Sequence, residues 1–335
     1  MMKNKITVLG GGSWGTAISK LLTENKHDVT IWIRDCEQAA LIENERENKK
    51  YLPGIILPAS LTISCNAEDS ISHSDIIVIA VPTQQVRLVL EAFKHKIDRK
   101  AIIVNLSKGL EKNTMLRVSE ICSGILPENK FVVLSGPSHA EEVALKMPTT
   151  VVAASDDENC AKIVQDVFMN EYFRVYTNSD VIGVEIGGAL KNVIALAAGI
   201  SDGLGFGDNT KAALINRGIQ EISRLAEQMG ADKLTFMGLS GIGDLIVTCT
   251  SMHSRNRRAG ILIGKGYAVD KAIKEIGMVV EGILTTHAAH ELAEKLSVEM
   301  PIVEELYAVL YENQKAALAV EKLMNRDKKD ETDKE

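Results

Sequence analysis

The chain has 335 residues, a formal net charge of −7 at pH 7 and 45% hydrophobic residues. A chain of this length exceeds what one hydrophobic core usually supports, so we expect about two domains. The acidic balance and the 4% content of aromatic residues offer neither a basic surface nor stacking side chains for a nucleic acid. A nucleic-acid partner is therefore not expected, and the partner is expected to be a small molecule.

Five cysteines stand at positions 36, 65, 122, 160 and 249, and no two of them form a C-x-x-C pair. This scatter argues against a disulfide framework and against a zinc site, so we expect no metal and a reducing, cytoplasmic location. The stretch before the first glycines is too short for a signal sequence, and the longest apolar run contains Glu185, Lys191 and Asn192. No membrane span is predicted.

Short segments rich in β-branched residues alternate with helical segments in the first half of the chain. The strands predicted from them cover residues 6–9, 28–32, 76–81, 101–104 and 131–134, and residues 149–154 and 173–176 could add two more. This alternation predicts βαβ units on a mostly parallel, doubly wound sheet that binds ligands at the carboxyl ends of its strands. After residue 180 helical periodicity predominates. We predict an α/β Rossmann domain over residues 1–179, an all-α domain over residues 180–325 and a charged tail over residues 326–335.

A glycine-rich segment, Gly10-Gly11-Gly12-Ser13-Trp14-Gly15, joins the first strand to the next helix. It fits the pattern G-x-G-x-x-G, in which Gly10, Gly12 and Gly15 permit a tight turn and the close approach of a pyrophosphate to a helix N-terminus. We predict a bound dinucleotide with Trp14 packed beside it. The alternatives are a purely structural glycine turn and a tryptophan that fills a gap over it.

Arg34 and Asp35 follow the second strand, where a dinucleotide-binding domain selects its cofactor. Arg34 suits the 2′-phosphate of NADP(H), whereas Asp35 suits the ribose hydroxyls of NAD(H), so both cofactors remain candidates. The alternative for Arg34 is a solvated surface arginine.

The next strand ends also carry polar side chains. Lys108 follows the predicted strand 101–104, and Ser138 follows the strand 131–134 after Gly136. We expect Lys108 to contact a substrate or cofactor oxygen; a solvated loop lysine is the alternative. His139 is a candidate acid or base, but Ser138 and His139 lack an evident third member for a nucleophilic triad.

Lys191 lies in the apolar, small-residue run 184–199, which predicts a buried helix. Burial of an ammonium group is costly without compensation, and it lowers the pKa of a lysine toward the range of proton exchange. The alternatives to a catalytic role are a structural ion pair with Glu185 and a side chain that extends to solvent.

The second half of the chain holds two more candidate groups. Asp244 and Thr248 are four residues apart, which places them on one helix face. Ser254, Arg255 and Asn256 open another helical segment, and a helix N-terminus that carries an arginine is suited to a phosphate. A capped surface helix with solvated arginines is the alternative.

Together these motifs resemble the bacterial NAD(P)-dependent glycerol-3-phosphate dehydrogenases over nearly the whole chain. The matching segments are residues 10–17, 134–140, 187–192, 241–245, 254–256 and 280–282. The resemblance implies that Lys191 is the catalytic lysine. The substrate residues that it implies are Lys108, Gly136, Ser138, Lys191, Asn192, Asp244, Thr248, Ser254, Arg255 and Asn256. The cofactor residues, with the motif glycines included, are Gly10, Gly12, Ser13, Trp14, Gly15, Arg34, Lys108, Ala140, Arg255, Val279 and Glu281.

The implied reaction is reversible hydride transfer between NAD(P)H and dihydroxyacetone phosphate, which gives sn-glycerol 3-phosphate for phospholipid synthesis. Lys191, as an ammonium, would donate a proton to the substrate oxygen, and Arg255 would hold the phosphate. The family also implies a homodimer. Two alternatives remain. One is a β-hydroxyacid or 6-phosphogluconate type dehydrogenase, which would need a carboxylate site in place of residues 254–256. The other is a noncatalytic dinucleotide-binding redox sensor, which would leave Lys191 unexplained.

Overall fold

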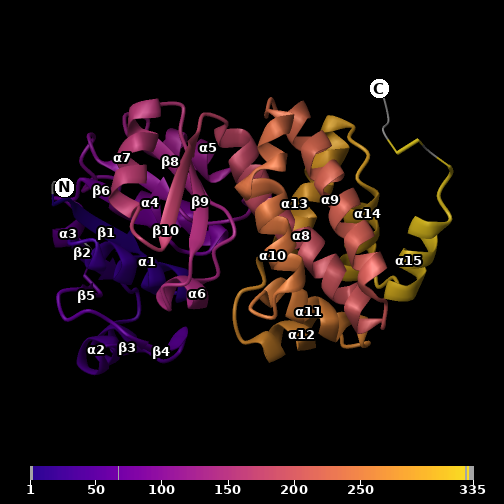
Figure 1. The fold of residues 1–335 in the computed structure, drawn as a ribbon, viewed down its shortest axis with the longest axis horizontal. Coiled ribbons are helices and arrows are strands. Elements are labelled where there is room, and N and C mark those ends of the chain that lie inside the picture. The colour runs from indigo at the N-terminus through magenta and orange to yellow at the C-terminus, as the bar shows by residue number, and fades with distance from the viewer. Residues whose placement is uncertain (1–2, 67, 329, 332–335) are drawn as a thin grey trace.

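The computed structural model describes residues 3–66, 68–328 and 330–331. Two parts lie side by side: a sheet covered by helices, formed by the first half of the chain, and a cluster of helices formed by the second half (Figure 1). The predicted fold class, a Rossmann-type α/β domain followed by an all-α domain, is confirmed. The last strand ends at Asn178 and the next helix begins at Val181. The division between residues 179 and 180 itself stays a prediction, and residues 329 and 332–335 of the predicted tail lie outside the described residues.

The strands of the main sheet are β1 (Lys5–Leu9), β2 (Asp28–Trp32), β5 (Thr62–Ser64), β6 (Ile76–Ile79), β7 (Ile102–Asn105), β8 (Phe131–Ser135), β9 (Thr149–Ala154) and β10 (Phe173–Asn178), and β3 (Glu47–Asn48) and β4 (Leu52–Ile56) form a separate hairpin. The helices among them are α1 (Ser13–Glu24), α2 (Cys36–Glu45), α3 (Glu68–Ile71), η1 (Thr83–Gln85), α4 (Val86–Phe93), α5 (Val118–Ile125), α6 (Ala140–Ala144) and α7 (Glu158–Phe168). The helical part consists of α8 (Val181–Gly203), α9 (Asp208–Gln228), η2 (Lys233–Met237), η3 (Leu239–Gly243), α10 (Asp244–Thr250), α11 (Arg255–Gly264), α12 (Val269–Ile276), α13 (Glu281–Leu296), α14 (Pro301–Tyr311) and α15 (Ala316–Met324).

The strand order of the main sheet is β5-β2-β1-β6-β7-β8-β9-β10. The order reverses between β1 and β6, and doubly wound sheets bind ligands in the crevice at such a point. Neighbouring strands are parallel except β8 and β9, which are antiparallel. All seven strands expected from the sequence are present. β5 and the hairpin are not evident in the sequence, because β5 spans three residues and β4 contains Pro53 and Gly54.

Helices cover both faces of the sheet. Ile76 and Val78 of β6 pack into the core shared with α1 and α7, whereas Ile77 and Ile79 pack into the core shared with α4 and α5. Successive side chains of a strand point to opposite faces, so a strand covered on both faces is apolar at every position. This burial explains why the strands appear as continuous apolar segments in the sequence.

Helix α8 is the centre of the helical part, and its side chains form much of the core there. Among the residues that the structure describes, it is the one helix long and apolar enough to cross a membrane, but 89% of the apolar window is buried within the protein. Such burial is typical of a core helix. The buried helix predicted around Lys191 is present.

Helices α8 and α11 cross with their backbones in close contact. A Cβ added to Gly199 would lie 2.1 Å from the carbonyl oxygen of Arg257, and one added to Gly260 would lie 2.2 Å from the carbonyl oxygen of Leu196. No side chain fits at either distance. The spacing of this crossing is therefore set by glycines on both helices.

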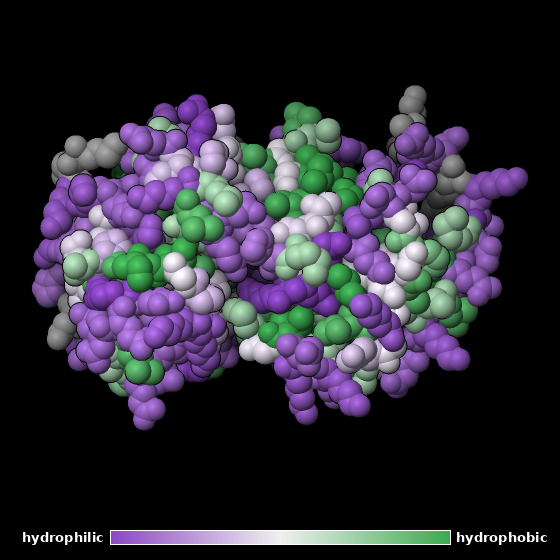
Figure 2. Space-filling view, turned by 60° about the horizontal axis from the view of Figure 1, so that its bottom comes forward, coloured by the Kyte–Doolittle hydropathy of each residue, from purple (hydrophilic) through white to green (hydrophobic). Residues whose placement is uncertain are grey.

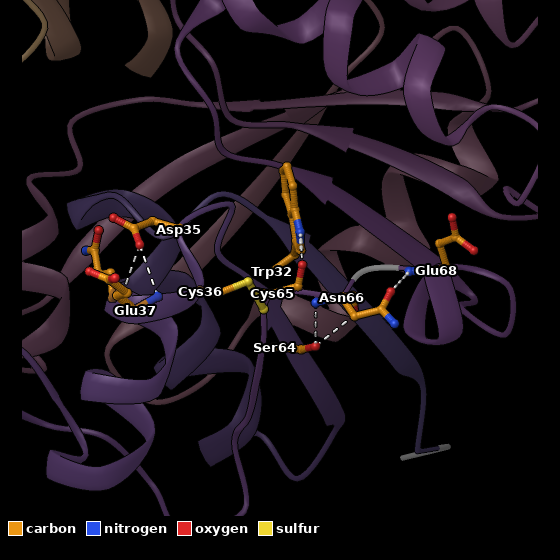
Figure 3. Close-up of a disulfide and its surroundings, with 9 residues drawn as sticks. Trp32, Asp35, Cys36, Glu37, Ser64, Cys65, Asn66 and Glu68 are labelled. Atoms are coloured by element: carbon orange, nitrogen blue, oxygen red, sulfur yellow. Dashed lines mark hydrogen bonds between the residues drawn. A yellow bond between two sulfur atoms is a disulfide. The ribbon is translucent and has the colours of Figure 1, made fainter.

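A disulfide joins Cys36, at the start of α2, to Cys65, directly after β5 (Figure 3). The expectation that the cysteines form no disulfide is wrong for this pair, whereas Cys122, Cys160 and Cys249 are free and buried. The two cysteines are 29 residues apart in sequence, but their Cα atoms are 5.0 Å apart. They meet because β2 and β5 are neighbouring parallel strands that end at the same edge. The sequence does not reveal this, since β5 itself is not evident.

Glu185, in the first half of α8, links the two parts of the molecule. Its carboxylate accepts hydrogen bonds from the Ser119 N–H at 2.9 Å and from Arg117 Nη1 at 3.0 Å, both at the N-terminus of α5. An ion pair between Glu185 and Lys191, one alternative for the lysine, is therefore wrong: Glu185 pairs with Arg117 and Lys191 pairs with Asp244. Burial raises the pKa of Glu185, although Arg117 and Ser119 oppose that rise.

We predict that Glu185→Gln lowers the free energy of unfolding by about 3 to 5 kcal/mol, because it removes the buried charge partner of the half-buried Arg117 guanidinium, which then keeps only the more exposed Glu120. Urea unfolding measures this change. Glu120→Gln is the matched control, since Glu120 also pairs with Arg117 but its side chain is 40% exposed, and removal of such an exposed partner should cost less than about 1 kcal/mol. Equal losses for the two variants would contradict the special role of the contact with α8.

Candidate active site

The segment between β1 and α1 forms the glycine turn expected from the sequence. Gly10 has a φ of +124°, and a Cβ there would lie 2.6 Å from the carbonyl oxygen of Ala80. Glycine is required at this position by both conformation and space. Helix α1 begins at Ser13, so its free N–H groups point toward the carboxyl edge of the sheet. The Ser13 hydroxyl donates to the carbonyl oxygen of Tyr51 at 2.6 Å.

The turn leaves room for a dinucleotide. A Cβ on Gly12 would meet no atom within 4 Å, so the space beside the helix N-terminus is open. Trp14 packs with Ala17 and Ala140, and its buried Nε1 has no hydrogen-bond acceptor among the residues described. An open helix N-terminus beside a buried donor without an acceptor fits a cofactor that contains a pyrophosphate.

Arg34 lies just beyond the end of β2, next to Ile33, whose side chain occupies the space beside Gly11. Arg34 is exposed and makes no hydrogen bond or ion pair with any other residue that the structure describes. The Asp35 carboxylate, in contrast, accepts hydrogen bonds from two N–H groups of the first turn of α2. Arg34 is thus available to a cofactor phosphate, while Asp35 is occupied as a helix cap.

Lys191, Asp244 and Lys108 form a buried ion network where the two parts of the molecule meet. Lys191 Nζ pairs with Asp244 Oδ1 and donates to Thr248 Oγ1 at 2.9 Å. Lys108 Nζ pairs with Asp244 Oδ2 at 2.8 Å and donates to the carbonyl oxygen of Gly136 at 3.0 Å. Asp244 and Thr248 both lie on α10, and Thr248 reaches back to the preceding turn through a hydrogen bond to the Asp244 carbonyl oxygen at 2.6 Å. One carboxylate thus bridges a lysine of α8 and a lysine that follows β7.

The network distributes its protons unequally. Burial lowers the pKa of Lys191 to about 7, an effect that the Asp244 charge partly offsets and the Lys108 charge strengthens. Burial alone would raise the pKa of Asp244, but the two lysines hold it below its ordinary value. Near neutral pH, Lys191 can therefore both hold and release a proton while Asp244 stays a carboxylate.

Two asparagines extend the network to α13. Asn256 Nδ2 donates to Asn192 Oδ1 at 2.9 Å, and Asn256 Oδ1 accepts from the Gly282 N–H at 2.8 Å. Asn192 Nδ2 donates to the carbonyl oxygen of Lys108 at 3.4 Å. These hydrogen bonds fix α8, α11, α13 and the Lys108 loop relative to one another.

The N-terminus of α11 has the features of an anion site. Ser254 is its N-cap, and the Ser254 Oγ accepts from the Arg257 N–H at 3.2 Å. Arg255 is half-buried and has no hydrogen bond or ion pair within the described part of the chain. Burial lowers the pKa of Arg255, and the nearby Glu281 carboxylate opposes that effect. A half-buried guanidinium with no partner at a helix N-terminus is suited to bind a phosphate.

Glu281, the first residue of α13, reaches across to η1, the short helix that follows β6. Its Oε1 accepts from the Thr83 N–H at 3.3 Å, and its buried Oε2 has no donor among the described residues. Burial raises the pKa of Glu281, an effect that Thr83 and Arg255 oppose. Val279 is 42% exposed and, like Arg34, takes no part in the contacts around Lys191.

His139 and His253 form a contact that the motifs did not predict. Their ring centroids are 5.6 Å apart, and each histidine directly adjoins a predicted substrate residue, Ser138 or Ser254. The buried Nε2 of His139 has no partner among the described residues, and burial together with the Lys191 charge lowers the pKa of His139. Ser138 Oγ donates to the carbonyl oxygen of Gly136 at 2.7 Å rather than to His139. The adjacency of each histidine to a substrate motif is the signal that could have identified this pair.

Strongly hydrophilic residues gather in the middle of one face of the molecule, where the two parts meet (Figure 2). At this junction the geometry combines a lysine that can exchange a proton near pH 7 with an arginine suited to an anion. The glycine turn adds a site for a dinucleotide. Such a combination can bind a phosphorylated carbonyl compound and exchange a proton with its oxygen.

Comparison with known proteins agrees with this geometry. Residues 5–161 and 180–321 match the family models described as the N-terminus and the C-terminus of NAD-dependent glycerol-3-phosphate dehydrogenase. The chain is 54% identical to a glycerol-3-phosphate dehydrogenase (NAD(P)+) of a Thermoanaerobacter species, with 98% of each protein covered, and 54% identical to that of Bacillus subtilis, with 97% of this chain and 95% of the relative covered. The crystal structure of glycerol-3-phosphate dehydrogenase from Coxiella burnetii has a TM-score of 0.94 at 38% identity and covers 97% of this chain and 99% of that one. The chain therefore belongs to the NAD-dependent glycerol-3-phosphate dehydrogenase family.

Proposed function

We propose that this chain transfers a hydride reversibly between NAD(P)H and dihydroxyacetone phosphate, with sn-glycerol 3-phosphate as the reduced product. Membership of the family makes the chain an NAD(P)-dependent oxidoreductase that acts on CH–OH groups. The observation that carries the substrate assignment is the presence of Lys191 and the unpaired Arg255 at one junction. Lys191 can hydrogen-bond a carbonyl oxygen and stabilise the charge that develops there, and Arg255 can bind a phosphate.

The glycine turn and the neighbouring strand ends supply the residues proposed to hold the cofactor. The space at Gly12 accommodates its pyrophosphate, Trp14 donates through Nε1, and Arg34 pairs with the 2′-phosphate of NADP(H). The full proposed set is Gly10, Gly12, Ser13, Trp14, Gly15, Arg34, Lys108, Ala140, Arg255, Val279 and Glu281. When bound, the cofactor supplies or accepts the hydride.

Lys191 is the proposed proton donor and acceptor. As an ammonium it hydrogen-bonds the substrate carbonyl oxygen and gives up its proton as charge develops there, and in the reverse direction the neutral amine takes the proton back. Asp244 and Thr248 hold its Nζ in place, and Lys108 adds positive charge. The full proposed substrate set is Lys108, Gly136, Ser138, Lys191, Asn192, Asp244, Thr248, Ser254, Arg255 and Asn256.

The remaining features of the proposal rest on the family resemblance. We infer a cytoplasmic homodimer that supplies sn-glycerol 3-phosphate for phospholipid synthesis. We assign the cofactor to residues 1–179 and the catalytic lysine to residues 180–325. Sedimentation of the purified chain measures its oligomeric state.

The decisive experiment follows NADPH absorbance after mixing the purified chain with NADPH and dihydroxyacetone phosphate. We expect turnover that needs both substrates, and we expect Lys191→Ala to retain NADPH binding while its kcat falls about 10²- to 10⁴-fold. Near-native turnover by Lys191→Ala would remove Lys191 from the mechanism. Turnover of a β-hydroxyacid or of 6-phosphogluconate in place of dihydroxyacetone phosphate would favour the other dehydrogenase types, and NADPH binding without turnover of any of these compounds would favour a redox sensor.

The pH dependence follows from the lowered pKa of Lys191. Because the reduction needs the ammonium, kcat/KM for dihydroxyacetone phosphate should fall as pH rises through about 7, and oxidation of sn-glycerol 3-phosphate should rise over the same range. Asp244→Asn removes the charge that raises this pKa, so it should shift both midpoints to lower pH. Initial rates across a pH series measure the midpoints. An unchanged midpoint in Asp244→Asn would assign the ionisation to another group.

Arg255→Ala should reduce kcat/KM for dihydroxyacetone phosphate strongly, because it removes a charge-assisted hydrogen-bond pair and the anchor that orients the carbonyl. Unphosphorylated dihydroxyacetone is the control. It has no phosphate for Arg255 to bind, so its already low rate should fall much less in the variant. Steady-state kinetics with the two substrates provide the comparison. Equal losses would show that Arg255 acts through the cofactor or the fold instead.

A further inference from the structure

The Cys36–Cys65 disulfide adjoins the proposed cofactor site and takes no part in the reaction described above (Figure 3). Cys36 begins α2, two residues after Arg34, and Cys65 directly follows β5. Because β2 and β5 are adjacent parallel strands, both cysteines lie at the carboxyl edge of the sheet. A dinucleotide binds at this same edge in doubly wound sheets.

The disulfide closes a loop that forms one wall of the glycine turn. The loop contains α2, the β3–β4 hairpin and β5. From the hairpin, Asn48 Nδ2 donates to the carbonyl oxygen of Gly11 at 2.9 Å and to Thr16 Oγ1 at 2.8 Å. The carbonyl oxygen of Tyr51 accepts from Ser13 Oγ at 2.6 Å. A covalent bond that closes this loop therefore also restrains the residues that shape the cofactor turn.

The backbone holds the two cysteines to different degrees. The carbonyl oxygen of Cys65 accepts from Trp32 Nε1 at 3.1 Å, and that of the preceding Ser64 accepts from the Ile33 N–H at 2.9 Å. Cys36 is exposed at the start of α2, where the exposed Asp35 is the N-cap. Cleavage of the S–S bond therefore removes the covalent link between the start of α2, which adjoins Arg34, and the end of β5, while the buried Ala39 and Ile42 keep the rest of α2 packed on the sheet.

A dissolved thiol compound can approach the disulfide from the side of Cys36. Cys36 is exposed and Cys65 is half-buried, whereas Cys122, Cys160 and Cys249 are buried. Thiol–disulfide exchange selects accessible cysteines. In a reducing compartment, disulfides of this kind are usually transient and redox-sensing rather than structural.

We propose that Cys36 and Cys65 form a reversible thiol–disulfide modification site that sets the affinity of this chain for the adenosine half of its dinucleotide. In the disulfide form, the N-terminus of α2 is fixed against the end of β5, so the wall of the cofactor site is ordered before binding. In the dithiol form, the wall becomes ordered only when the dinucleotide binds, and the entropy lost in this ordering weakens binding. The inference rests on the proposed function, because it takes the dinucleotide to lie at the glycine turn.

The modification is a balanced two-electron exchange. The two thiols lose two protons and two electrons as the S–S bond forms. The oxidant is a low-molecular-weight disulfide, whose own S–S bond breaks to give two thiols by way of a mixed disulfide with the protein. A low-molecular-weight thiol reverses the reaction.

The first measurement counts thiols in the denatured full chain after treatment with oxidised or reduced glutathione. We expect three reactive thiols in the oxidised chain, those of the free cysteines, and all five in the reduced chain. Five thiols in both samples would overturn the proposal, because the pair would not form under oxidising conditions. Three thiols in both would overturn it equally, because the bond would not be reversible.

The second measurement is NADPH binding to both forms, followed by quenching of tryptophan fluorescence. We expect the reduced chain to bind NADPH about three- to tenfold more weakly, the scale of one ordered contact. The same factor should appear for 2′-phospho-ADP, which carries only the adenosine half, and none should appear for reduced nicotinamide mononucleotide. With NADPH saturating, kcat for dihydroxyacetone phosphate should be equal in both forms.

The double variant Cys36→Ser/Cys65→Ser is the control, and its NADPH affinity should equal that of the reduced chain under either treatment. Equal NADPH affinity of the oxidised and reduced parent chain would overturn the redox proposal and leave the proposed function intact. A redox effect that persists in the double variant would assign it to another cysteine. Failure of both forms to bind NADPH would instead overturn the proposed function.

Discussion

The arrangement of the active site depends on one carboxylate, that of Asp244, shared by two lysines from different parts of the molecule. Without this carboxylate, the ammonium groups of Lys108 and Lys191 would lie together without a counter-charge, at a cost of several kcal/mol. With it, the cluster keeps a net positive charge, which suits a phosphorylated substrate, and Lys191 remains able to release its proton. The position of Asp244 is itself constrained, because α10 begins directly after η3, in which a Cβ on Gly241 would lie 2.2 Å from the carbonyl oxygen of Phe236.

Helix α8 connects the sheet to Lys191, the proposed catalytic lysine. Its first half is held to α5 through Glu185, and six residues later Lys191 reaches the network with Asp244. The same helix therefore contacts the cofactor-binding part at one point and performs the proposed chemistry at another. A rigid, fully packed helix is a suitable connection, since its side chains have few alternative positions.

The sequence predicted the elements that repeat a strong pattern and missed those that depend on tertiary neighbours. The apolar strands, the glycine turn and the buried helix around Lys191 could be recognised because burial on both faces leaves a clear signature. β5 is too short for periodicity, so the meeting of Cys36 and Cys65 could not be foreseen. The family resemblance placed Lys191 and Asp244 at one site but did not pair them, and the pairing of Glu185 with Arg117 required the N-terminus of α5 to meet α8. A carboxylate in an apolar helix nevertheless predicts a partner of opposite charge, just as a lysine there does.

The glycine crossing of α8 and α11 has a consequence for which substrates fit. Lys191 belongs to one of these helices and Arg255 to the other, and the backbones touch at Gly199 and Gly260 with no side chain between them. The spacing of the two backbones that carry the proposed proton donor and the proposed phosphate ligand is therefore set by glycines rather than by side chains. Exchange of a side chain at the site can alter its charge, shape or reach, but it leaves the spacing of the two backbones unchanged. A compound with an extra carbon between its carbonyl and its phosphate would have to be accommodated by the side chains of Lys191 and Arg255 rather than by a change in the spacing of α8 and α11.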